Sequence, residues 1–304
     1  MKKIRIITLL SSLVLLAACD ASSGIAPTFA KEGEETTYEN FMNQYSNVKS
    51  ESELFDTSLS LSDRSQKVSY YDSILTIVKR GNSEIEKTES TMSAKGEIQF
   101  DYDNFTAKTE ADSKSVDKLT SPDETRNNTS TEKTNYIYQY SRKNSASGLY
   151  IFNLKTKECS LYSSGASSKS HFDSFVRNQT SGMTYWFENN LPLNTKVAKQ
   201  YLYYINNETQ FTYIYNLDKT ENQAGRNVTT RLKIKAQIEL ADKKQKVLVS
   251  LEETLTTTYT AKSGIYVAGD VVTTETKEYR DYSITSKDYN ISKIDDSDYT
   301  NISY

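Results

Sequence analysis

The chain has 304 residues and a formal charge of −3, from 37 lysines and arginines against 40 aspartates and glutamates. Because these charges nearly balance, the sequence offers no basic surface for a nucleic-acid backbone, and we expect no nucleic-acid partner. The 23 tyrosines far outnumber the 10 glycines and 3 prolines, and tyrosine suits the half-buried face of a sheet. The composition therefore favours a β-rich fold.

The first residues form a short charged segment that is followed by an apolar one. A positively charged start precedes an uncharged, apolar stretch over residues 6–18, which is shorter than the roughly 20 residues that a membrane-spanning helix needs. This stretch runs into Leu16, Ala17, Ala18 and Cys19. The four residues resemble the lipobox of bacterial lipoproteins.

The lipobox resemblance implies an exported protein that is held on the cell membrane by lipid and faces away from the cytoplasm. The three residues before Cys19 are then the recognition residues, residues 1–18 are removed, and acyl chains on Cys19 anchor the mature chain. An ordinary secretory signal with an incidental cysteine and an uncleaved N-terminal anchor are the two alternatives.

Residues 20–35 contain serines, glycines, a proline and charges without hydrophobic periodicity, so we expect a flexible tether there. We expect a single domain over residues 36–304. Its first element is predicted to be a helix over residues 36–48, because apolar side chains recur at helical spacing after a threonine N-cap. Residues 68–78 fit a helix or a strand equally well.

Several later segments alternate apolar and polar residues, which is typical of strands with one solvated face. The clearest prediction is a hairpin, in which residues 231–240 and 247–251 pair across a polar turn at 241–245. The polar, aperiodic residues 112–134 are expected to form a long exposed loop. The other predicted strands cover residues 98–102, 136–140, 150–154, 211–217 and 279–284.

A helical insert is predicted near residues 168–206, between the two strand-rich halves. Phe172, Phe175 and Val176 have helical spacing, and a second helical stripe covers residues 197–205. Large rings gather in this insert, where they either pack on the sheet or line an apolar cavity. The candidate cavity residues are Tyr185, Trp186, Phe187, Tyr201 and Tyr204.

These elements predict an α+β, β-rich fold. We expect one curved antiparallel sheet or an incomplete β-barrel, with an N-terminal helix and the helical insert between two strand-rich halves. The alternation of strands with one wet side favours antiparallel pairing.

The sequence gives little support to catalysis or metal binding. His171 is the single histidine, and Cys159 is the one cysteine besides Cys19, so neither a zinc site nor a disulfide framework is expected. Asp101 and Asp103 resemble the start of a calcium loop, but Thr106 stands where that loop needs glycine. We therefore expect no enzyme activity, no cofactor and no metal.

In outline the chain is similar to LolA and to the mycobacterial lipid-carrier lipoproteins, over roughly residues 36–290. The resemblance rests on anchoring and element order, so it assigns no site residue. It implies that the domain binds or carries a lipid or another hydrophobic molecule between sheet and helices. The competing hypothesis is a structural or interaction lipoprotein with a filled core, which contacts an envelope or host component.

Overall fold

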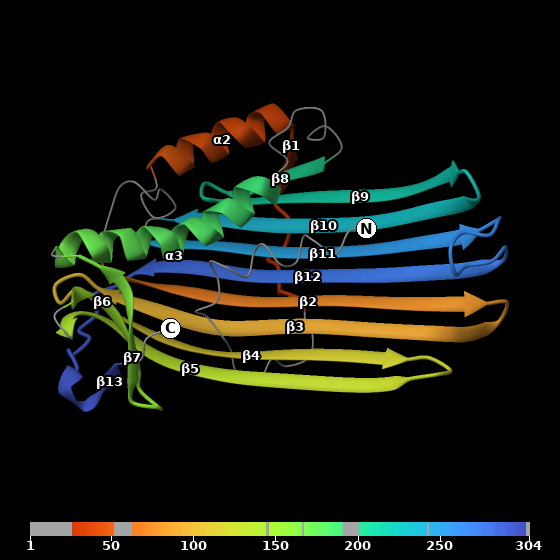
Figure 1. The fold of residues 1–304 in the computed structure, drawn as a ribbon. Coiled ribbons are helices and arrows are strands. Elements are labelled where there is room, and N and C mark those ends of the chain that lie inside the picture. The colour runs from red at the N-terminus through yellow and green to blue at the C-terminus, as the bar shows by residue number, and fades with distance from the viewer. Residues whose placement is uncertain are drawn as a thin grey trace.

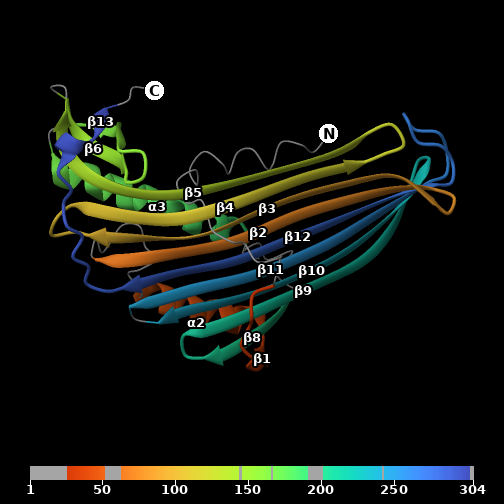
Figure 2. The same cartoon turned by 90° about the horizontal axis from the view of Figure 1, so that it is seen from below.

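The computed structural model describes residues 26–51, 63–143, 146–165, 167–190, 201–241 and 243–301. These residues form one open, curved sheet of 13 strands, with two α-helices on one of its faces (Figures 1 and 2). The predicted β-rich α+β class and single sheet are confirmed. No helix in the described part of the chain is long and apolar enough to cross a membrane.

The sheet consists of two antiparallel meanders that meet where β12 pairs with β2. From one edge to the other, its strands are β1 (Glu34–Thr36), β8 (Tyr201–Asn207), β9 (Gln210–Gln223), β10 (Arg226–Ala241), β11 (Lys244–Tyr259), β12 (Asp270–Ser286), β2 (Arg64–Arg80), β3 (Ser83–Asp101), β4 (Thr106–Thr120), β5 (Thr125–Lys143), β6 (Ala146–Asn153), β7 (Glu158–Ser164) and β13 (Thr300–Asn301). The helices are α2 (Tyr38–Glu51) and α3 (Ser168–Asn190), and Asp296–Asp298 form a 3-10 turn. Neighbouring strands are antiparallel except β13, which runs parallel to β7.

Both helices pack on the same face of the sheet, which we call the helix face. Alternate residues of a strand point to opposite faces, so the registers place Phe211 and Ile238 together on the side that faces Phe41 of α2. Phe172 and Phe175 of α3 pack in the same way on Phe100 of β3. The opposite surface carries no helix among the described residues, and we call it the open face.

The predicted hairpin at residues 231–251 is confirmed as β10 and β11, whereas the predicted loop at 112–134 is wrong. Those residues form most of β4 and β5, which pair through a short turn at residues 121–124. Side chains on both faces of this part of the hairpin are largely exposed. With no buried face, the strands carry no apolar alternation by which a sequence pattern could reveal them. Residues 68–78, which fitted a helix or a strand, belong to β2.

The helical insert is confirmed for its first part, because residues 168–190 form α3. It is wrong for residues 201–206, which belong to strand β8 and pair with β9. Apolar residues at Tyr201, Tyr203 and Ile205 satisfy a strand period, and hydrogen bonding to β9 decides between that period and the helical one. Residues 191–200 lie outside the described part of the chain.

The second half of the expected tether lies on the sheet. The Ala30 N–H donates to Oε1 of Gln237 over 2.9 Å, and Lys235 forms an ion pair with Glu32. Both β10 side chains belong to the open face. The chain then turns around the sheet edge as β1, which pairs with β8, and enters α2 on the helix face. Residues 16–19, which include the predicted lipidation site, lie outside the described residues.

Candidate functional site

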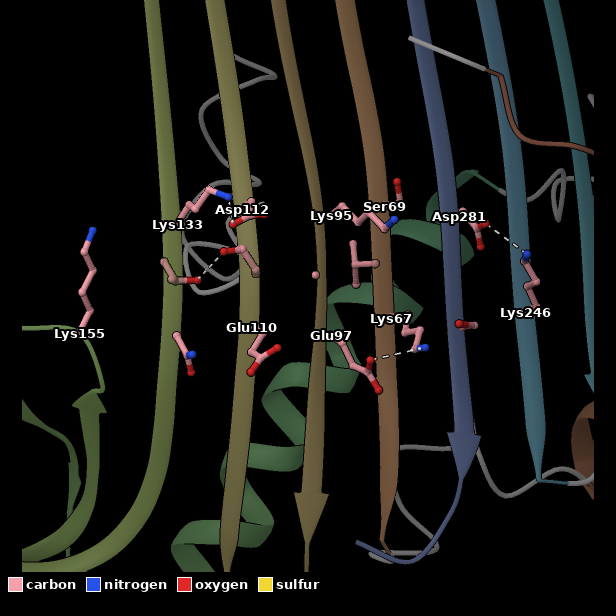
Figure 3. Close-up of a pocket in the computed structure, with 16 residues that line it drawn as sticks. Lys67, Ser69, Lys95, Glu97, Glu110, Asp112, Lys133, Lys155, Lys246 and Asp281 are labelled. Atoms are coloured by element: carbon pink, nitrogen blue, oxygen red, sulfur yellow. Dashed lines mark hydrogen bonds and ion pairs between the residues drawn. The ribbon is translucent and has the colours of Figure 1, made fainter. Parts of the chain in front are cut away.

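A groove of about 870 Å³ crosses the strands of the open face (Figure 3). Its floor consists of two rows of side chains, because residues paired across antiparallel strands point to the same face. The first row is Lys246, Ser283, Lys67, Glu97, Glu110 and Asn135. The second row is Asp281, Ser69, Lys95, Asp112 and Lys133.

Each of the four carboxylates in the groove has a lysine partner. The Nζ–O distances are 3.4 Å for Lys67–Glu97, 3.7 Å for Lys133–Asp112 and 3.2 Å for Lys246–Asp281. Glu110 pairs with Lys108, which lies two residues earlier in β4 and therefore on the same face. These acids are therefore largely neutralised by cations that belong to the fold.

Two lysines of the groove are not used in this way. The exposed ammonium groups of Lys95, at the centre of the second row, and of Lys155, in the β6–β7 turn, have no ion-pair partner among the described residues. Asn153 fixes that turn, because its side-chain oxygen accepts from the backbone N–H groups of Lys155 and Thr156. The groove thus has a surplus of positive charge.

The C-terminal segment crosses the open face near the ends of β3, β4 and β5, beyond the residues that line the groove. The Ile291 N–H donates to the Asp101 carboxylate over 2.7 Å, and the Thr106 hydroxyl donates to the Ile291 carbonyl. Ile294 is held similarly, since its N–H donates to Gln139 and its carbonyl accepts from the same side chain. Asp101 therefore anchors this segment, which gives it a structural role in place of the calcium-loop resemblance.

The helix face carries a second surface, which is apolar. It consists of half-buried side chains that continue from the cluster beneath α2 toward the uncovered end of β9, β10 and β11. We call it the apolar strip, and its members are Leu217, Leu232, Ile234, Leu251 and Leu255. Cross-strand pairs join Leu217 to Leu232 and Ile234 to Leu251, and Leu232 and Ile234 are neighbours on the same face of β10. The half-buried Glu253 faces Leu232 from β11 and separates Leu251 from Leu255, so the strip is interrupted by one carboxylate on its β11 side.

An ion cluster around the buried Arg280 borders the apolar strip on its β12 side. Glu278 pairs with Leu251 across the strands, and Arg280 forms ion pairs with Glu278 and with Asp72 of β2. Burial raises the pKa of Asp72 and of Glu278, while the Arg280 guanidinium opposes both shifts. Arg280 also lies over the ring of Tyr70, which holds the guanidinium against the sheet.

Of the predicted cavity residues, the structure places Tyr201 beside the apolar strip. Its ring stacks on Tyr215 at a centroid distance of 4.6 Å, on the helix face of β8 and β9. Tyr204 points to the open face, because it lies three positions along the same strand, so these two residues do not line one cavity. Tyr185, Trp186 and Phe187 belong to α3, and their side chains lie outside the described part.

Cys159 and His171 both pack against other elements of the fold. Cys159 is 1% exposed in a cluster with Phe152 and Tyr299, and its thiol is therefore packed. Nδ1 of His171 lies 3.1 Å from the Ser163 hydroxyl, which joins the start of α3 to β7. Among the described residues, no group of three or more histidines, cysteines, aspartates or glutamates is placed to hold a metal ion.

No family model matches the chain, and no curated protein matches it. The solved structures that match the chain include one titled "Lipid-protein interactions in lipovitellin", with 12% sequence identity and a TM-score of 0.32. The alignment covers 77% of this chain and 26% of the other, so the chain spans about a quarter of the length of that protein. These comparisons assign no function to the chain, so we infer its function from the side chains on the two faces of the sheet.

Proposed function

We propose that the chain is an exported lipoprotein, anchored through Cys19, that binds or carries a lipid or another hydrophobic ligand and is not an enzyme. The observation that carries the proposal is the apolar strip, whose five leucine and isoleucine side chains are all half-buried. Water contact with such side chains is unfavourable, and each methylene that a ligand removes from water contributes about 0.8 kcal/mol.

The borders of the strip fit an amphiphile. An acyl chain would cover the leucines of β9, β10 and β11, and the Arg280 cluster would meet polar groups at one end of that chain. Phe41 of α2 and Phe175 of α3 fill the space directly beneath their helices. The ligand would therefore lie beside the helices, where Tyr201 stands.

The binding proposal is tested by placing a charge in the strip. Purified Cys19→Ser protein should carry a lipid that mass spectrometry detects in an organic extract, and should bind the fluorescent fatty acid cis-parinaric acid. Leu232→Asp should lose most of that binding. Leu202→Asp is the matched control, because Leu202 is a 45% exposed leucine on the open face of β8.

The outcome that rejects a hydrophobic ligand is an extract free of lipid together with equal probe binding by all three proteins. Circular dichroism of each variant establishes that the sheet is intact. Because Leu232 faces Glu253 across the strands, Leu232→Asn is a second variant that removes the apolar side chain without setting two carboxylates opposite each other, and it should lose probe binding as well.

The anchor has its own test. Cells that express the wild-type chain should incorporate labelled palmitate into it, and mass spectrometry should find a diacylglyceryl group on Cys19 as the first residue. Cys19→Ser should abolish the label and release the protein from the membrane fraction. A wild-type chain that begins elsewhere, or carries no acyl group, contradicts the anchor.

One observation favours the competing interaction hypothesis. The loop between β11 and β12 presents Ile265 with 78% of its surface exposed, although backbone hydrogen bonds between Ser263 and Tyr266 order the loop. An ordered, exposed apolar tip suits contact with another protein. Ile265→Ser should abolish cross-linking to an envelope component if this hypothesis holds, and should leave lipid binding unchanged.

A further inference from the structure

We propose that the open-face groove is a second binding site, which takes a small anionic ligand with phosphate or carboxylate groups. This site is independent of the hydrophobic ligand, because the groove and the apolar strip lie on opposite faces of the sheet. At about 870 Å³ the groove has the size of a small-molecule pocket.

The charge balance selects the sign of the ligand. Five lysines line the groove, and three of them, together with Lys108 beside it, pair with its four carboxylates. Lys95 and Lys155 remain without an ion-pair partner among the residues described. A cationic ligand would have to displace an existing pair, whereas an anionic ligand uses charges that are already available.

The placement of Lys95 favours a specific site over a diffuse positive surface. It lies on β3, an interior strand whose backbone is paired on both sides, with β2 and with β4. Ser69 and Asp112 flank it across the strands, and the Ser69 hydroxyl can donate to the same ligand. Lys155 approaches from the β6–β7 turn at the border of the groove, so a ligand of groove length meets ammonium groups from two separate elements (Figure 3).

Three probes separate the sources of the anion. Inorganic pyrophosphate and citrate represent free phosphate and carboxylate compounds, and phosphatidylglycerol vesicles represent an anionic lipid headgroup. Titration calorimetry of the Cys19→Ser protein should show binding that weakens as sodium chloride rises, because salt screens exposed charges. Lys95→Gln and Lys155→Gln should each weaken it about fivefold, as loss of about 1 kcal/mol predicts.

The matched control is Lys262→Gln, which removes an exposed lysine from the β11–β12 loop. Selective weakening by the two groove variants supports the site. Pyrophosphate or citrate binding then identifies a free anion as the ligand, and binding to vesicles alone identifies a headgroup. Failure of the wild type to bind all three probes, or equal weakening by Lys262→Gln, overturns the proposal. Leu232→Asp should bind the probes normally, which keeps this test separate from that of the apolar strip.

Discussion

The carboxylate of Asp270 is fully buried at the start of β12, where Arg80 donates to both of its oxygens over 2.9 Å. The Val267 N–H donates to one of the same oxygens, so Asp270 also fixes the β11–β12 loop. These hydrogen bonds lower the pKa of Asp270 to about 2. Because an unfolded aspartate has a pKa of about 3.9, Asp270 stabilises the fold above that pH.

This stabilisation should disappear as the pH falls from about 4 toward 2, because Asp270 is then protonated and its ion pair is lost. Asp270→Asn should lower the urea midpoint at pH 5 and should remove this part of the acid sensitivity. Asp123→Asn, in the exposed β4–β5 turn, is the control. If the urea midpoint of Asp270→Asn falls between pH 4 and 2 as much as that of the wild type, this role of Asp270 is contradicted.

Single residues also show which features of the structure a sequence pattern predicts and which it does not. The alternation at 231–240 predicts its hairpin, because one face of that strand is buried and the period is visible. The sequence around Lys95 does not mark it as a site residue. Its role in the groove depends on Asp112 and Ser69, which face it from two other strands. The groove was therefore missed from the sequence, although charged residues at alternate positions, such as Lys95 and Glu97, mark its polar face.

Among the elements, α3 depends on a few rings for its position. Phe175 is 0% exposed, and its ring stacks on Tyr138 at 4.4 Å and meets Tyr162 edge-on at 5.3 Å. Phe175→Ala should lower the free energy of unfolding by about 3–5 kcal/mol, because it leaves a cavity between helix and sheet. Lys169→Ala, on the exposed side of the same helix, should change it by less than about 0.5 kcal/mol. Urea titration measures both values. Equal stability of the two variants would show that contacts other than those of Phe175 hold α3 on the sheet.

The short strand β1 depends on a close approach of two backbones. A Cβ added at Gly33 would lie 2.1 Å from the carbonyl oxygen of Ile205, which real structures do not tolerate. Gly33→Ala should therefore displace residues 26–36 from the sheet and make them sensitive to limited proteolysis. Thr28→Ala, an exposed change in the same segment, should stay as resistant as the wild type. Resistance of the Gly33→Ala protein would show that β1 shifts without detaching.

At the scale of the whole molecule, the two outermost strands of the sheet, β8 and β7, each pair on their outer side with a short strand, β1 or β13. β1 covers β8, and β13 covers β7 through Thr300, whose N–H donates to the Lys157 carbonyl over 2.9 Å. Tyr299 reinforces this end, because its ring meets Phe152 at 5.2 Å. Unpaired edges are templates for pairing with other chains, so these short strands protect the edges of β8 and β7, whereas residues 216–223 of β9 and 125–135 of β5 pair on one side only.

Removal of residues 296–304 should expose the β7 edge and cause self-association, which light scattering detects as a mass that rises with concentration. Removal of residues 302–304 alone leaves β13 in place and is the matched control. A monomeric protein after the longer deletion would show that β13 is not needed to protect the edge.

The global arrangement marks the limit of prediction from this sequence. Composition and alternation predict a single β-rich sheet, because they report local burial. They do not predict that β12 pairs with β2, since residues about 200 positions apart meet only once the other strands are in place. They also miss β4 and much of β5, whose two solvated faces remove the alternation.

The attachment of residues 29–36 to the sheet would set the working distance of the protein if Cys19 carries the proposed lipid. If all of residues 20–35 were free, the sheet would stand up to about 50 Å from the acyl chains, but Phe29 and Ala30 already contact β10, and residues 20–28 span at most about 30 Å. The edge formed by β8, β9 and β10 would thus be held close to the headgroups. Since the apolar strip begins on β9, a hydrophobic ligand could pass between bilayer and strip over a short path, with little time in bulk water.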